Sequence, residues 1–162
     1  MKDTIYVGIG EFGISRNPQQ QIKTMALGSC VGVIAHDKVS GAWGLLHIAL
    51  PESSINLKRA EAKPGTFADT GIPALLKGMR RAGWDTKNRL TIRLAGGASI
   101  MDPNATFNIG KRNILATKKI LWKYRLGPIA EHIGGEISRT VIIDIEAGKV
   151  YLSSPARGQW EL

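Results

Sequence analysis

The single cysteine of the chain, Cys30, is its strongest candidate for chemistry. It stands in the run Leu27-Gly28-Ser29-Cys30, and His47 follows seventeen residues later. A lone thiol cannot form a disulfide within the chain, whereas a thiol beside a histidine becomes a nucleophile at neutral pH. Gly28 and Ser29 permit an open backbone before the thiol, whose amide groups suit an oxyanion. The alternative interpretation is structural: a small buried thiol and a core histidine without a catalytic part.

A predicted β-hairpin brings the thiol and the imidazole together. Two apolar segments, the first starting at Cys30 and the second containing His47, flank a stretch of turn-forming residues. Pairing His36 with Trp43 sets Gly32 opposite His47, so Cys30 and His47 become diagonal neighbours on one face, roughly 7–8 Å apart at the backbone. A slip of one residue would place them on opposite faces. The hairpin register therefore tests the interpretation.

Length and composition indicate one globular domain over residues 1–162. Hydrophobic residues make up 43% and charged residues 22% of the chain. The lone cysteine, the absence of a signal-peptide pattern and the lack of a run of roughly eighteen apolar residues favour a cytoplasmic protein without membrane insertion. The net charge of +9 favours acidic partners. A nucleic acid is the weaker choice, because no helix-turn-helix, zinc-ligand or RNA-binding motif organises the basic residues.

Apolar spacing predicts the α+β class. Strands are expected at 4–10, 22–27, 90–95 and 129–133, and a second hairpin at 140–145 and 150–154. Apolar residues spaced three and four positions apart predict amphipathic helices over 66–83 and 109–124. The apolar side of the second helix is expected to carry Ile114, Leu115, Ile120, Leu121 and Tyr124. Hairpins with two helices are typical of an α+β domain whose helices cover one or both faces of a sheet. Residues 155–162 are expected to form a loose tail, although Trp160 has the size to anchor it.

Five short motifs occur in a fixed order along the chain. They are Leu27-Gly28-Ser29-Cys30; His47 followed by Leu50-Pro51; Lys63-Pro64-Gly65 with Ala68-Asp69; Ala95-Gly96-Gly97-Ala98-Ser99; and Asn108-Ile109-Gly110 with Arg112-Asn113. The series closely resembles the CheD family of bacterial chemotaxis proteins, the chemoreceptor glutamine deamidases. The resemblance extends over nearly the full chain, from Val7 to Val150.

The resemblance implies a cysteine hydrolase that converts glutamine side chains of chemoreceptor cytoplasmic helices into glutamates through a thioester. It implies Cys30 as the nucleophile, His47 as the base and Thr24 as the residue that orients the imidazole, without a metal or organic cofactor. It also implies a β-sandwich-like mixed sheet core flanked by two main helices, similar to the catalytic domain of cytotoxic necrotizing factor toxins. We expect backbone amides around Ser29 and Cys30 to hold the oxyanion, Gly28 to keep the backbone open there, and Ser99 to shape the substrate groove or a turn.

Other functions remain open at this point. The chain could act as a non-catalytic partner of chemoreceptors or of a CheC-type phosphatase, with which CheD proteins also pair. A thiol-dependent hydrolysis of glutamate methyl esters would keep the enzyme class and change the bond. One departure from the family pattern concerns the rim of the site: Glu136-Ile137-Ser138 follows Gly134-Gly135 where an Asn-Arg pair is usual. This departure bears on substrate preference and leaves the residues Cys30, His47 and Thr24 unaffected.

Overall fold

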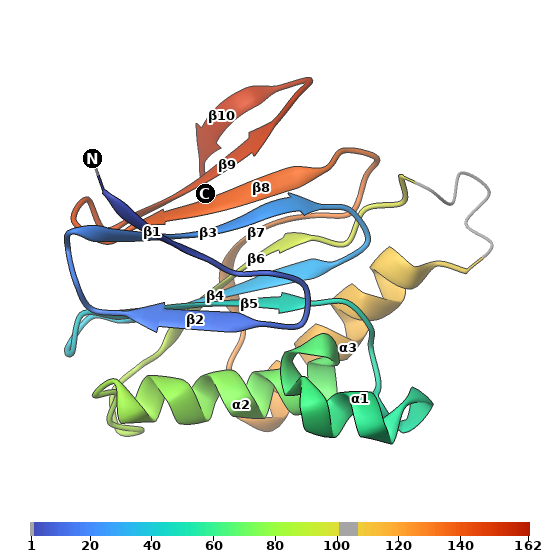
Figure 1. Cartoon of the computed structure of the whole chain (residues 1–162), viewed down its shortest axis with the longest axis horizontal. Helices are drawn as coiled ribbons and strands as arrows, with labels where there is room; N and C mark the ends of the chain where they lie inside the picture. Colours follow the sequence, from blue (N-terminus) through green and yellow to red (C-terminus); the bar gives the residue numbers. More distant parts are fainter. Residues whose placement is uncertain (1, 101–106) are drawn as a thin grey trace.

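Two five-stranded β-sheets packed face to face form the body of the protein, and two main helices cover the outer face of one sheet (Figure 1). The computed structural model describes residues 2–100 and 107–162. The first sheet consists of β1 (Asp3–Tyr6), β3 (Gln20–Leu27), β8 (Arg139–Asp144), β9 (Lys149–Ser154) and β10 (Gly158–Glu161), in that order. The second consists of β2 (Phe12–Ser15), β5 (Ala42–Ile48), β4 (Val31–Asp37), β6 (Thr91–Gly96) and β7 (Pro128–Ile133).

Both sheets are mixed. The pairs β1–β3 and β6–β7 are parallel, and the other neighbouring pairs are antiparallel. The helices are α1 (Leu57–Ala62), α2 (Ala68–Arg81) and α3 (Ile109–Lys123), with short 3-10 turns at Ser53–Ile55 and Pro64–Thr66. Both long helices lie near their predicted ranges. The predicted α+β class, with a sandwich of mixed sheets and two main helices, is confirmed.

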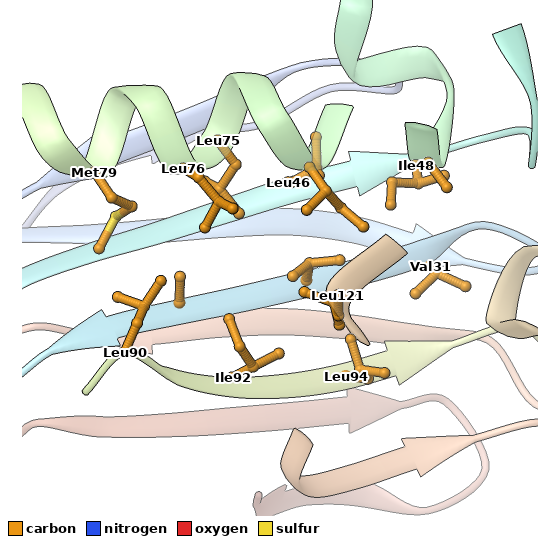
Figure 2. Packing of buried hydrophobic residues seen from close by; sticks show 14 of the residues in the cluster. Val31, Leu46, Ile48, Leu75, Leu76, Met79, Leu90, Ile92, Leu94 and Leu121 are labelled. Atoms are coloured by element: carbon orange, nitrogen blue, oxygen red, sulfur yellow. The ribbon is translucent and has the colours of Figure 1, made fainter. Parts of the chain in front are cut away.

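Alternation along β5 divides its side chains between two apolar layers. Trp43 and Leu45 belong to the cluster that fills the space between the sheets. Leu46 and Ile48 point the other way, into the cluster that α2 and α3 cover (Figure 2). Because strand side chains alternate with a period of two, His47 must point into the space between the sheets.

The C-terminal residues depart from the expectation. Residues 158–161 pair antiparallel with β9 as strand β10, so a loose tail is wrong for this segment. Trp160 lies opposite Leu152 and packs against the apolar layer between the sheets. The Arg157 guanidinium also lies 4.2 Å from the centre of the Trp160 ring. Anchoring by one large aromatic side chain therefore outweighs the polar composition of the segment.

Candidate active site

The hairpin register agrees with the one that the sequence predicts. His36 lies opposite Trp43 and Gly32 lies opposite His47 in the β4–β5 ladder. Cys30, two residues before Gly32, packs against the same inter-sheet layer into which His47 points. A Cβ added to Gly32 would also meet Leu27 and Val141, residues of that layer. The thiol and the imidazole therefore lie on one face, at the end of the hairpin where β4 begins and β5 ends (Figure 1).

A threonine from the opposite sheet contacts the imidazole. The Thr24 hydroxyl on β3 lies 2.7 Å from Nδ1 of His47, and it donates a hydrogen bond of 2.7 Å to the carbonyl oxygen of Val7. Thr24 is fully buried and His47 is 3% exposed. Since β3 and β5 belong to different sheets, this contact links the two halves of the sandwich at the candidate site.

These two hydrogen bonds fix the imidazole tautomer. A hydroxyl has one hydrogen to donate, and here the Val7 carbonyl accepts it. Nδ1 of His47 must therefore carry a proton and donate it to the Thr24 oxygen, which leaves Nε2 as the acceptor. Nε2 is buried and has no hydrogen-bond partner among the described residues. His47 is thus prepared to receive a proton at Nε2.

Burial determines the resting charge of the pair. Burial lowers the pKa of His47 from 6.5 to about 4, and it raises the pKa of the half-buried Cys30 thiol. Both pKa shifts arise because burial favours the uncharged form of each group. The pair therefore rests as a neutral thiol and a neutral imidazole at pH 7. Proton transfer between them must accompany the attack on a substrate.

Three successive carbonyl groups hold the loop that carries the thiol. The Gly28 carbonyl accepts from the Ala98 N–H at 2.8 Å, and the Cys30 carbonyl accepts from the Gly97 N–H at 2.8 Å. Between them, the Ser29 carbonyl accepts from Nδ2 of Asn113 at 3.0 Å. All three bonds use carbonyl oxygens, so they do not occupy the N–H groups of Ser29 and Cys30.

Comparison with known proteins identifies the family. The CheD family model, described as chemotactic sensory transduction, matches residues 49–154. A Syntrophotalea carbinolica protein named "Probable chemoreceptor glutamine deamidase CheD" is 50% identical over 163 residues and covers all of both chains. A protein of the same name from Solibacter usitatus is 43% identical over 93% of this chain and 88% of its own length. This chain belongs to the CheD family.

The family model and the full-length relatives cover different parts of the site. The model match begins two residues after His47, so it does not include Thr24, Cys30 or His47, whereas the S. carbinolica relative aligns with the entire chain. Among solved structures, a Neisseria meningitidis protein of the DUF152 family matches 83% of this chain and 63% of its own, with a TM-score of 0.45 and 8% identity. That likeness is too weak to support an argument.

The glycine motif after β6 has a direct structural role in this CheD-family protein. Gly96 has φ +108°, and a Cβ there would overlap the carbonyl oxygen of Cys30. Gly97 has φ +67°, and a Cβ there would overlap Ile114 of α3. Gly110 in turn permits the close approach of α3 to the Gly97 carbonyl. The glycines of two separate sequence motifs therefore bring β6 and α3 against the loop of the nucleophile.

Ser99 lies at the edge of the same segment. Its N–H donates to the Gly135 carbonyl at 2.9 Å, and the Gly134 N–H donates to the Gly96 carbonyl at 2.9 Å. The buried Arg139 side chain also donates to the Gly134 carbonyl, at 2.7 Å. The two glycines directly before the segment that departs from the family pattern are thus attached to the strand end beside Cys30. Ser99 is half-buried there, and its contact with a substrate stays a prediction.

Asn113 is a site residue to which the sequence alone assigns no role. It is fully buried on α3, and its Nδ2 donates to the carbonyl oxygens of Ser29 and Ala49, each at 3.0 Å. Ser29 precedes the nucleophile and Ala49 follows the strand of His47. The only signal in the sequence is its place in the fifth motif, since a lone asparagine in a helix does not reveal what it contacts.

Metal ligands do not cluster in the part of the chain that the structure describes. In residues 2–100 and 107–162, no group of three or more His, Cys, Asp or Glu side chains gathers closely enough to hold a metal ion. Within the same residues, no helix has the length and apolar character needed to cross a bilayer.

Proposed function

We propose that this protein is a cysteine-dependent hydrolase that deamidates glutamine side chains of bacterial chemoreceptors to glutamates, in chemotaxis adaptation. The observation that supports it best is the polar chain from the Val7 carbonyl through Thr24 to His47, which leaves Nε2 unprotonated on the face that Cys30 shares. Family membership and the names of the relatives support the substrate class. The proposal places the enzyme in the cytoplasm, where receptor signalling helices lie.

Each proposed step uses residues of the site. Nε2 of His47 takes the thiol proton while Sγ of Cys30 attacks the carboxamide carbon of the glutamine. The N–H groups of Ser29 and Cys30 stabilise the oxyanion of the tetrahedral intermediate. His47 returns the proton to the departing ammonia, which leaves a thioester on Cys30. Water then attacks the thioester with His47 as the base, releasing glutamate and restoring the thiol.

The other proposed roles follow from position. Thr24 orients the imidazole and holds its tautomer. Gly28 keeps the loop backbone open, and a Cβ added there would lie 3.8 Å from Ile100, at the exposed side of the loop. Ser99 borders the substrate. A CheC-type phosphatase is a proposed partner. We also propose that the sandwich is related to the catalytic domain of cytotoxic necrotizing factor toxins, and superposition of the two folds tests this relationship.

Peptide mass spectrometry tests the proposed reaction. A purified chemoreceptor cytoplasmic domain is incubated with the wild-type protein, with Cys30→Ala or with His47→Gln, and its peptides are examined for conversion of glutamine to glutamate. We expect conversion at defined glutamines with the wild type and none above background with either variant. Conversion that persists with Cys30→Ala contradicts the thiol mechanism. If folded wild-type protein converts nothing yet binds the receptor, the protein is a binding partner.

A further inference from the structure

A groove of about 840 Å³ lies far from the candidate active site, where α2 and α3 end and β6 and β7 begin. Figure 1 shows α2 ending at the opposite end of the molecule from the arrowhead of β5, which carries His47. The charged side chains that line this groove are all basic: Lys77, Arg80, Lys87, Arg89 and Arg125. The hydrolase chemistry proposed above gives none of them a function.

The floor and walls of the groove are apolar. Leu76 and Leu90 are buried at its base, where they also belong to the layer between the second sheet and the helices (Figure 2). Tyr124 is 47% exposed and Ile129 is 48% exposed along the walls. Trp84 donates its indole N–H to the Asn88 carbonyl at 3.0 Å. This bond satisfies the polar atom of the indole, so the ring presents an apolar surface to the groove.

The basic side chains of the groove lack acidic partners among the described residues. The four ion pairs in that part of the chain involve Lys2, Lys63, Lys118 and Lys149, which do not line the groove. The nearby Asp85 accepts a hydrogen bond from the Lys87 N–H at 3.0 Å, so it serves the turn after α2. Five positive charges around a concave apolar floor outnumber the single nearby carboxylate of Asp85 and form no ion pair among the described residues, so the groove is complementary to an acidic ligand that carries apolar side chains.

We propose that this groove is a distal docking site for an acidic amphipathic helix of the protein substrate. A helix supplies both features together, with apolar side chains on one face and carboxylates along its borders. A nucleic acid supplies the charge but no aliphatic side chains for Leu76 and Leu90. A flat bilayer surface does not reach the base of a groove. The proposal rests on the proposed function only in naming the deamidated receptor domain as the partner.

Binding is measured in a Cys30→Ala background, so its result does not depend on catalysis. The groove variant carries Arg80→Glu and Lys87→Glu, both at exposed positions. A matched variant with Lys38→Glu and Lys58→Glu, both at exposed positions outside the groove, has the same change in net charge. We expect the groove variant to bind the intact receptor cytoplasmic domain at least about tenfold more weakly at low salt. The matched variant should retain affinity, and high salt should reduce the difference.

Kinetics with an active thiol separate docking from chemistry. The groove substitutions should raise KM for the intact domain and leave its kcat unchanged. They should also leave kcat/KM unchanged for a short peptide around one target glutamine, because such a peptide does not reach the groove. Equal binding by the groove and matched variants overturns the proposal. A groove-dependent affinity for duplex DNA or anionic vesicles, with unchanged affinity for the receptor domain, also overturns it. Groove-dependent binding without any deamidation by the wild type supports the docking site and refutes the proposed hydrolase.

Discussion

Asn113 lies 3.0 Å from the carbonyl oxygen of Ser29, and through this hydrogen bond α3 holds the residue before the nucleophile. The same nitrogen reaches the Ala49 carbonyl, directly after the strand of His47. One fully buried side chain therefore sets the spacing between the two segments that carry the thiol and the imidazole. The amide suits this role because it has two hydrogens to donate, one to each carbonyl.

Substitution of Asn113 by Asp should lower kcat by at least about tenfold, because the carboxylate would repel both carbonyls and release the loop. We expect KM for a short peptide to change little, and the unfolding free energy to fall by about 1–3 kcal/mol. Steady-state kinetics and urea denaturation measure the two effects. Thr117→Val is the control, because Thr117 is also buried on α3 and its hydroxyl has no hydrogen-bond partner among the described residues. A kcat for Asn113→Asp equal to that of the control contradicts the positioning role.

Replacement of Thr24 by Val should lower kcat about 10²–10³-fold. Valine has nearly the same shape, yet it leaves the Nδ1 hydrogen of His47 and the Val7 carbonyl without their partner, so the Nδ1-protonated tautomer loses its support. Thr24→Ser retains the hydroxyl and should recover most of the activity. The measurement is kcat for a glutamine peptide across pH. Thr91→Val, which removes a hydroxyl donating to the His36 carbonyl, serves as the control. Full activity in Thr24→Val would show that the threonine is structural.

The pH dependence of stability should reveal the buried His47. Its pKa is about 4 in the folded protein against 6.5 for the ordinary group, because burial disfavours the cation. Between these values the unfolded chain binds more protons, so the free energy of unfolding rises with pH through this range. A pKa shift of this size contributes about 3 kcal/mol to the free energy of unfolding at neutral pH, and this contribution is lost as the pH falls from about 6.5 to 4.

Urea denaturation at several pH values measures this contribution. His36, whose pKa burial also lowers to about 4, adds a dependence of the same sign. His47→Gln should therefore reduce the slope of the unfolding free energy against pH in this range, and His36 and His132, whose pKa values are also lowered by burial, contribute to the remaining slope. The acid limb of kcat/KM should fall nearer pH 4 than 6.5, since protonation of Nε2 removes the base. A slope that is the same in wild type and His47→Gln would contradict the buried neutral imidazole.

The sequence predicts local relationships well and distant ones poorly. Side-chain alternation and the turn residues determine the β4–β5 register, so the shared face of Cys30 and His47 follows from the residues themselves. Thr24 is different: its contact with His47 crosses between sheets, and only the family resemblance singles it out. Asn113 reaches two segments 84 and 64 positions away. Contacts of this range depend on how the layers pack, which periodicity does not determine.

The remaining errors have a similar cause. Spacing alone places Leu115 and Tyr124 on the apolar side of α3, yet they are 58% and 47% exposed. Apolar periodicity identifies a helix and its approximate buried face, but the width of that face depends on the neighbouring elements. The strand β10 has only Trp160 as an apolar anchor, which is too little alternation for a strand prediction. The basic groove arises only in three dimensions, because its lining residues come from segments that are distant in the sequence.

Introducing a methyl group at Gly96 should disable the site through the backbone. Gly96 has φ +108°, and a Cβ there would overlap the carbonyl oxygen of Cys30. Gly96→Ala must therefore displace the Cys30 loop and weaken its 2.8 Å bond from the Gly97 N–H. We expect loss of at least about 99% of kcat/KM, because small displacements of a nucleophile cost about a hundredfold. Gly148→Ala is the control: Gly148 has φ +66°, and a Cβ added there would meet no described atom within 4 Å, so it tests backbone strain alone. If thermal unfolding shows both variants to be folded and they retain equal activity, the close approach of β6 to the nucleophile is not needed for catalysis.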